Sequence, residues 1–268
     1  MSLRINQNIA SLNAYRNLSV NDGMMAKSLE KLSSGLRINR AADDAAGLVK
    51  SEGLRAEVRG SQQAVKNAQD GVSFVQTAEG ALNEVSAILQ RMRELAVDAN
   101  NTATTDGVAQ KAETDELVKE IDDIGSQTTF NGKAVFGSSA VTFQVGSGAG
   151  ETLSVTVGAL SKSAVGGKDL SSFDPKAATA ISDIDAAIAG ISGTRATLGA
   201  SQNRFEHRIN SLNVAVENLS ASESRIRDTD MASEMSSYTR SQILTQAGTA
   251  MLAQANSAPQ AVLQLLRG

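Results

Sequence analysis

The side chains that most often carry catalysis or bind metals are scarce in this chain. Among 268 residues there is no Cys and only one His, His207. Their scarcity excludes a thiolate metal site, a cysteine nucleophile and any site that needs two imidazoles. The carboxylate pairs Asp43-Asp44 and Asp122-Asp123 lie on polar helix faces, where solvated side chains are expected. The sequence therefore predicts no cofactor and indicates an interaction protein, not an enzyme.

Motifs and net charge exclude further classes of protein. The chain has neither a phosphate-binding glycine loop nor a Gly-x-Ser-x-Gly turn between a strand and a helix. A formal net charge of −4 argues against a nucleic-acid partner, because domains that bind nucleic acid are basic. No stretch approaches the roughly 18 apolar residues of a membrane-spanning helix, so no membrane insertion is expected. The first residues, Met1–Asn8, lack the apolar core of a secretory signal peptide, and on these observations alone the protein is expected in the cytoplasm.

Regularly spaced apolar residues predict the main elements of the fold. They recur at alternating steps of three and four from Val65 to Ala99 and again from Ile181 to Ile226. This spacing places them on one face of a helix, and we expect two long helices, over about 43–99 and about 176–227. Because the two helices have matching lengths, they are expected to pack side by side as antiparallel rods. The predicted fold class is mainly α, a coiled-coil-like bundle of long helices.

Two shorter elements complete the predicted fold. Apolar residues at helical spacing from Val108 to Ile124 predict a third helix, preceded by a loop of small polar residues over 100–106. The segments 141–145 and 153–157 alternate apolar and polar side chains around a glycine-rich turn, which predicts a small β-hairpin region at the middle of the sequence. An isolated hairpin is marginally stable in water, so we expect it to lie against the helices. Its turn is expected at the tip of a chain that folds back on itself.

The two ends of the chain keep helical spacing but carry few charges. From Met231 to Gly268 only Glu234, Arg240 and Arg267 are charged. A helix with so few charges is poorly solvated on its outer face, and one chain does not provide enough partner surface. The candidates for polymerisation contacts between copies are therefore Ile5, Ile9, Leu12, Leu29, Leu32 and Leu36 in the N-terminal arm, and Leu244, Ala247, Met251, Ala255, Val262 and Leu265 in the C-terminal arm. Spacing alone leaves open a generic helical scaffold or a coiled-coil signalling rod.

Motifs in a fixed order identify a family resemblance. They are Ile5–Ala14, Leu32–Asn39, Ala42–Leu48, Gln90–Ala96, Phe130–Gly132, Ser224–Asp230, Ile243–Gly248 and Leu252–Asn256. With these motifs the sequence resembles bacterial flagellin, in a short form with a minimal variable region. The similarity covers essentially the whole chain apart from about 138–175.

The resemblance implies a structural subunit that polymerises into the extracellular filament of the bacterial flagellum, which serves motility. It implies export of the unfolded chain by the flagellar type III apparatus without a cleaved signal peptide, which replaces the cytoplasmic expectation. The implied domains are 1–42 with 228–268 in the inner tube, 43–137 with 176–227 in the outer tube, and 138–175 as a variable hairpin tip. The implied partners are further copies of the chain, filament cap and hook-junction proteins, and a flagellar export chaperone.

Flagellins are also ligands of an innate immune receptor, Toll-like receptor 5, and the resemblance implies the same for this chain. The matching motif places receptor-binding residues at Arg91 and Leu95 on the long helix and at Glu113 on the next helix. Residues four apart share one helix face, and we expect this face to be exposed. The chain has Asp98 where the family more often has Gln, and we expect the added charge to weaken recognition.

Two alternatives remain open on the sequence. One is a hook–filament junction protein of the same superfamily, which also has paired terminal helices. The other is a non-flagellar coiled-coil scaffold. The strong match at both ends and the near absence of a variable middle favour the filament subunit.

Overall fold

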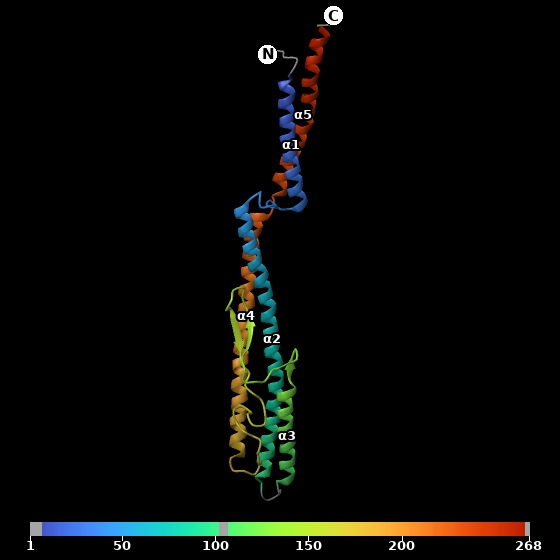
Figure 1. Cartoon of the computed structure of the whole chain (residues 1–268). Coiled ribbons are helices and arrows are strands. Elements are labelled where there is room, and N and C mark those ends of the chain that lie inside the picture. Colours follow the sequence, from blue (N-terminus) through green and yellow to red (C-terminus); the bar gives the residue numbers. More distant parts are fainter. Residues whose placement is uncertain (1–6, 102–106, 266–268) are drawn as a thin grey trace. The chain divides into compact units, whose positions relative to one another are not determined.

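The computed structural model describes residues 7–101 and 107–265, and for 258–265 it describes the backbone alone. Within these residues the chain forms five helices and four short strands (Figure 1). The helices are α1 (Ile9–Ser34), α2 (Ala45–Ala99), α3 (Val108–Gln127), α4 (Ala180–Arg227) and α5 (Met231–Leu265), and the strands are β1 (Thr129–Phe130), β2 (Lys133–Ala134), β3 (Val141–Gln144) and β4 (Thr152–Val155). These elements confirm a mainly α fold with a small β region. No helix in the described part of the chain has the length and apolar character needed to cross a membrane.

The chain divides into two compact units, which are described separately. The terminal unit comprises the chain up to Ala56 and from Leu219 onward, and the central unit is Glu57–Asn218. The segment 138–175 belongs to the central unit. The three-part division implied by the resemblance, with boundaries at residues 42, 137, 175 and 227, stays a prediction.

In the central unit, α2 and α4 lie side by side and run in opposite directions (Figure 1). Arg93 of α2 pairs with Asp185 of α4 at 2.7 Å, and Glu79 of α2 pairs with Arg195 of α4 at 3.5 Å. Residue numbers therefore fall along α4 as they rise along α2, and the predicted antiparallel packing is confirmed. The predicted apolar faces form the core: Ala68, Val75, Ala78, Leu82, Val85, Leu89 and Met92 of α2 and Ile184, Ile191, Leu198, Phe205 and Leu212 of α4 are buried.

Four phenylalanines join the β region to the two long helices. Phe205 of α4 is fully buried, and its ring meets that of Phe143 of β3 edge-on, with centroids 5.5 Å apart. Phe74 of α2 lies 5.7 Å from Phe143 on one side and 5.9 Å from Phe130 of β1 on the other. Gly71 makes room for this cluster, because a Cβ atom at that position would lie 2.6 Å from the Phe205 ring.

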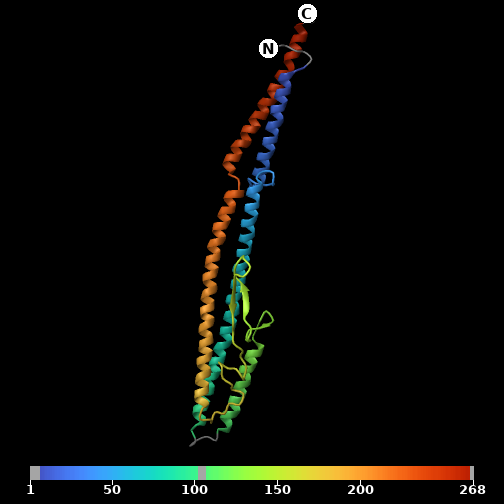
Figure 2. The ribbon, with the colours of Figure 1, turned by 60° about the vertical axis from the view of Figure 1, so that its left-hand side comes forward.

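The predicted β-hairpin is present and packs on the helices of the central unit (Figure 2). β3 and β4 pair in antiparallel register, with Val141 opposite Val155. The turn between them lies close to α2, since a Cβ atom on Gly60 would lie 2.9 Å from Ser147. The turn therefore runs along α2, as expected for a hairpin that lies against the helices. This position corrects the expectation that the turn lies at the tip of the folded-back chain.

Two helix side chains hold the hairpin in place. Asn67 of α2 donates to a carbonyl of β3 at 3.0 Å, and Arg208 of α4 donates to the Val145 carbonyl at 2.7 Å. The Arg208 guanidinium also pairs with Glu151 at 2.9 Å. The pKa of Glu151 is lowered, first because the Gly148 N–H donates to its carboxylate and then because Arg208 does. The carboxylate therefore stays charged at pH values below those at which a glutamate is usually protonated. The contact is lost only as the pH falls through this lowered pKa.

The structure contains a second, shorter hairpin that was not predicted from the sequence. β1 and β2 pair with Phe130 opposite Lys133 around a two-residue turn. Asn131 and Gly132 in this turn have φ angles of 49° and 76°, and a type I′ turn requires positive values at both positions. Asn-Gly is a strong signal for such a turn, so the sequence contained the information needed to find it.

The bounds of the predicted helices differ from the structure at two places. α4 begins at Ala180 and not near residue 176, because the Asp174 carboxylate accepts a hydrogen bond from the Lys176 N–H at 3.0 Å and forms a local turn. α2 begins at Ala45, two residues later than expected. The predicted third helix is confirmed as α3, while 102–106 of the loop before it lie outside the described residues.

Candidate assembly surface

The interior of the terminal helix pair combines small and polar side chains with a few half-buried apolar ones, among them Leu18, Met25 and Leu252. α1 and α5 lie side by side, with many of their Cα atoms within 8 Å of each other (Figure 1). The buried side chains of the pair include Ser28 of α1 and Ser241 of α5. Gly248 of α5 approaches Leu18 of α1 so closely that an added Cβ atom would lie 3.3 Å from the leucine. Small residues permit this close approach, but they bury little apolar surface.

Hydrogen bonds provide part of the contact between α1 and α5. The Thr245 hydroxyl donates to the Asp22 carboxylate at 3.2 Å, and the Ser11 hydroxyl donates to the Asn256 side chain at 2.8 Å. Asn8, the N-cap residue of α1, donates to a carbonyl of α5 at 2.8 Å. A net hydrogen bond contributes only about 1 kcal/mol, so these contacts align the helices more than they stabilise them.

Large apolar side chains lie on the outside of the same helix pair. Leu12 of α1 is 60% exposed and Met251 of α5 is 64% exposed. We call the exposed set the outer apolar surface: Ile9, Leu12, Tyr15, Val20, Met24 and Leu29 on α1, and Met231, Met235, Ile243, Leu244 and Met251 on α5. In an ordinary surface helix the apolar stripe faces the partner helix and the polar face meets water. The terminal pair departs from this arrangement, because these large apolar side chains face outward in addition to the half-buried ones inside the pair.

The structure places the predicted polymerisation residues in three groups. Ile9, Leu12, Leu29, Leu244, Ala247 and Met251 lie on the outside of the pair. Leu32, Leu36 and Ala255 are half-buried. Ile5 lies outside the described residues, as do the side chains of Val262 and Leu265. The sequence-based set omitted Tyr15, Val20, Met235 and Ile243, because it followed one helical stripe on each arm while apolar residues occur around both helices.

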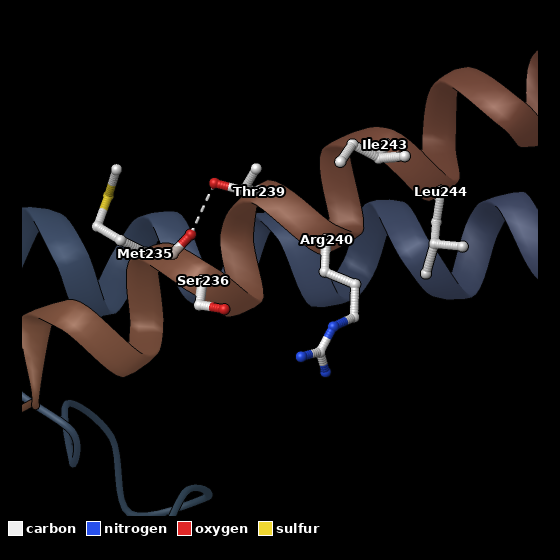
Figure 3. Close-up of a pocket in the computed structure, with 6 residues that line it drawn as sticks. All are labelled: Met235, Ser236, Thr239, Arg240, Ile243 and Leu244. Atoms are coloured by element: carbon white, nitrogen blue, oxygen red, sulfur yellow. Dashed lines mark hydrogen bonds between the residues drawn. The ribbon is translucent and has the colours of Figure 1, made fainter.

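The outer apolar surface on α5 is hollowed into a shallow groove (Figure 3). Its lining comprises Met235, Ser236, Thr239, Arg240, Ile243 and Leu244. The Thr239 hydroxyl is satisfied within the helix, where it donates to the Met235 carbonyl at 2.8 Å. Arg240 points away from α5, and it is one of only two charged residues between Met231 and Leu265. The groove thus combines the positively charged guanidinium of Arg240 with apolar neighbours, a composition typical of interface hot spots.

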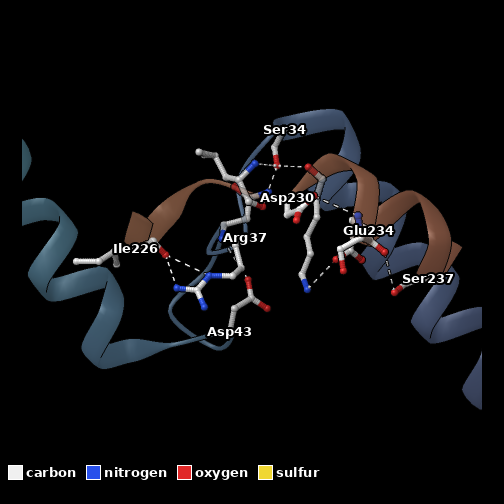
Figure 4. A network of polar contacts seen from close by, with 11 residues as sticks. Ser34, Arg37, Asp43, Ile226, Asp230, Glu234 and Ser237 are labelled. Carbon is white, nitrogen blue, oxygen red and sulfur yellow. Dashed lines mark hydrogen bonds and ion pairs between the residues drawn. The ribbon is translucent and has the colours of Figure 1, made fainter. Parts of the chain in front are cut away.

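Backbone pairing fixes the connectors that lead from α1 to α2 and from α4 to α5. The Arg37 N–H donates to the Arg227 carbonyl at 2.6 Å, and the Thr229 N–H donates to the Gly35 carbonyl at 2.9 Å. The Arg37 guanidinium donates to the Ile226 carbonyl at 2.6 Å (Figure 4). Gly35 ends α1 with a φ of 72°, a left-handed conformation that glycine adopts without strain. These contacts hold the two connectors side by side and fix which residues of one connector lie opposite which residues of the other.

Charged side chains surround these connectors. Arg227 is 9% exposed and pairs with Glu52 at 2.9 Å. This hydrogen bond is the main cause that lowers the pKa of Glu52. The pKa of Asp43 is lowered by the N–H groups of Arg40 and Asn39, which donate to it. Both carboxylates therefore remain charged at pH values below those at which they are usually protonated. The connectors lose these contacts only when the pH falls through the lowered pKa values.

The candidate receptor residues lie in the central unit, where α2 packs beside α3. Arg91 of α2 pairs with Glu113 of α3 at 2.8 Å and with Glu94 at 3.2 Å, and all three side chains are largely exposed. Leu95 is only 6% exposed, which corrects the expectation that it shares an exposed face with Arg91. Asp98 accepts a hydrogen bond from Gln110 of α3 at 2.7 Å. The structure therefore brings Arg91 and Glu113 together at the surface and places Leu95 in the core.

The described residues contain no group of three or more His, Asp or Glu residues that could hold a metal ion. His207 is exposed, as expected from its position between buried Phe205 and half-buried Ile209. Fold and surface together define a structural coiled-coil protein with paired terminal helices.

Comparison with known proteins identifies the family. Residues 5–140 match the bacterial flagellin N-terminal helical region, and residues 181–266 match the bacterial flagellin C-terminal helical region. The chain is 46% identical to a flagellin of Bacillus subtilis (strain 168), over 99% of this chain and 100% of that protein. It is 50% identical to a flagellin of Halalkalibacterium halodurans and 46% identical to a flagellar filament 33 kDa core protein of Treponema phagedenis, over 98% of this chain and 99% of each relative. The crystal structure of a Bacillus cereus flagellin aligns with a TM-score of 0.47 and 30% identity, over 55% of this chain and 88% of that one.

The chain belongs to the bacterial flagellin family. It is a structural subunit of the extracellular flagellar filament and not an enzyme, which confirms the resemblance found in the sequence.

Proposed function

We propose that copies of the chain polymerise through the outer apolar surface of the terminal unit. One observation carries this proposal: large apolar side chains such as Leu12, Ile243 and Met251 lie on the outside of the α1–α5 pair, while its most buried side chains are Ser28 and Ser241. Apolar patches of this kind on a soluble protein mark interaction sites, because a further partner must cover them. Further copies of the chain provide that cover. A head-to-tail contact whose rotation does not close then generates a helical fibre.

In this proposal, ordering of the terminal helices is coupled to polymerisation. The small interior of the α1–α5 pair buries little apolar surface and stabilises the two helices weakly in a free subunit. Contacts with neighbouring copies bury the outer apolar surface and supply the missing stabilisation. The terminal arms, about 1–42 and 228–268, should therefore gain order as the polymer forms.

We expect the helix content of the chain to rise on polymerisation. Far-ultraviolet circular dichroism of one sample before and after polymerisation measures this change. A control chain that ends at Arg227 cannot form the α1–α5 pair, and it should neither polymerise nor gain helix. Equal helix content in the free and polymerised states of the full chain would contradict the coupling.

The remaining partners follow from the need to keep the outer apolar surface covered. We propose that an export chaperone covers it inside the cell and that the flagellar type III apparatus exports the chain unfolded. At the two ends of the polymer, cap and hook-junction proteins replace the missing copies. The terminal arms line the inner tube, and α2 to α4 form the outer tube. The supporting observation is the same exposed surface, which is large and nearly uncharged on α5.

We also propose that the pair Arg91 and Glu113 is recognised by Toll-like receptor 5. The supporting observation is the exposed ion pair between α2 and α3, next to a second pocket whose lining includes Glu94 and Asp98 of α2. Leu95 acts indirectly, because its buried side chain fixes the helix face from which Arg91 projects. A planar guanidinium on an exposed face is a common anchor in protein interfaces.

Replacing Arg91 by Ala is expected to weaken receptor activation about tenfold, a loss typical of an interface hot spot. Arg59→Ala is the matched control, because Arg59 is an exposed arginine on α2 in the same unit, about nine helical turns from Arg91. A reporter-cell dose response with free subunits measures the potency of both variants. Equal potency of Arg91→Ala and Arg59→Ala would remove Arg91 from the receptor contact.

A further inference from the structure

The methionines of this chain are distributed unevenly between surface and core. Met24 of α1 and Met231, Met235 and Met251 of α5 are 45%, 48%, 49% and 64% exposed. Met92 of α2, in contrast, is fully buried in the central unit. The four exposed residues are all members of the outer apolar surface. Because the chain has no Cys, these thioethers are the most exposed oxidisable sulfur atoms among the described residues, where Met25 of α1 is half-buried.

We propose that Met24, Met231, Met235 and Met251 form an oxidation-sensitive modification site that controls polymerisation. A peroxide converts them to sulfoxides in the free subunit, and the oxidised subunit does not add to the polymer. This inference rests on the proposed function, since it requires the outer apolar surface to be the contact between copies.

The chemistry needs only the thioether and the oxidant. A sulfur lone pair attacks one oxygen of hydrogen peroxide, the O–O bond breaks, an S–O bond forms, and the second oxygen leaves as water. The sulfur is oxidised by two electrons and the peroxide is reduced. Thiol-dependent methionine sulfoxide reductases reverse the step, so the modification acts as a switch.

The geometry explains why oxidation blocks assembly. Unmodified methionine is flexible and apolar and fills irregular contacts, whereas the sulfoxide carries a strong hydrogen-bond acceptor. Met235 lies in the groove beside Ile243 and Leu244, so a sulfoxide there replaces an apolar contact with a polar one that needs a donor such as Arg240 (Figure 3). Burying the sulfoxide oxygen costs its hydration, so the contact between copies is weakened.

The same geometry makes the switch specific for the free subunit. In the polymer the four thioethers are covered by neighbouring copies and lose access to the oxidant. Oxidants therefore stop growth by inactivating free subunits and leave existing polymer intact.

The experiment compares free subunits and polymer exposed to the same dose of hydrogen peroxide. Peptide mass spectrometry measures the gain of one oxygen at each methionine, and sedimentation measures the critical concentration for polymerisation. In free subunits the four exposed methionines should be oxidised and Met92 should not. The critical concentration of the oxidised subunits should rise at least about tenfold, which corresponds to about 1.4 kcal/mol, and reductase treatment should restore it.

The control is the variant with Met24, Met231, Met235 and Met251 all replaced by Leu, with each protein compared to its own untreated sample. Peroxide should leave the critical concentration of this variant unchanged. If treated and untreated wild type polymerise equally while the four residues are protected in the polymer, the switch is overturned and the proposed function stands. If the four residues oxidise equally in subunit and polymer, the outer apolar surface is not the contact, and both proposals fail.

Discussion

Replacing Leu12 by Asp is expected to abolish polymerisation while the central unit stays folded. Leu12 is 60% exposed on the outer apolar surface, so the free subunit tolerates a carboxylate there. In the polymer the variant loses the burial of a leucine, worth about 1.5–3 kcal/mol, and must also bury an unpaired charge. The combined loss raises the critical concentration more than about a hundredfold. Sedimentation and negative-stain electron microscopy measure polymer, and circular dichroism of the free subunit measures folding.

Val108→Asp is the matched control for this prediction. Val108 is 74% exposed at the start of α3 in the central unit and is not part of the terminal helix pair. The substitution introduces the same charge at an exposed apolar residue outside the outer apolar surface. Polymerisation of Leu12→Asp at the wild-type critical concentration would move the assembly contacts to another part of the molecule.

Replacing Phe205 by Ala is expected to lower the free energy of unfolding of the central unit by about 3–5 kcal/mol. Phe205 is fully buried and connects α4 to the hairpin through Phe143. Its removal leaves a cavity between the long helices and β3 that the rigid elements cannot close. Denaturant unfolding of the free subunit, followed by circular dichroism, measures the change.

Two glycines of α2 provide a sharper test of the same packing. A Cβ atom on Gly71 would lie 2.6 Å from the Phe205 ring, whereas a Cβ atom on Gly80 would have nothing within 4 Å. Gly71→Ala should therefore lower the free energy of unfolding. Gly80→Ala should raise it by about 0.5–1 kcal/mol, because alanine favours helix over glycine. A stabilising effect of both substitutions would show that Phe205 does not contact α2 as described.

The long helices could be predicted from the sequence because their environment is simple. α2 and α4 each present one apolar face to the core, and the steps of three and four identify that face directly. The start of α4 could not be placed, because the Asp174 side chain competes with the helix for a backbone N–H. The hairpin β1–β2 was predictable from Asn131-Gly132, but its strands are too short to show alternation.

The assembly surface could be predicted only in part. The scarcity of charge on the C-terminal arm indicated that it needs partners, but it did not show which side of each helix faces the other. Ser28, Ser241 and Gly248 contribute to this, because these small residues let α1 and α5 approach closely, while Leu12, Ile243 and Met251 lie on the outside. Spacing also misplaced Leu95: it is four residues from exposed Arg91, yet it lies in the core beside α3. A helix face changes from exposed to buried within one turn, so spacing between two residues does not fix their exposure.

The central claim is that copies of this chain contact one another through the outside of the α1–α5 pair. Electron cryomicroscopy of filaments grown from the purified chain tests it most directly. We predict that the side chains of Leu12, Ile243 and Met251 lie against neighbouring copies, with Ser28 and Ser241 facing each other inside one copy. A filament in which Leu12, Ile243 and Met251 face solvent or the α1–α5 interior would contradict the claim.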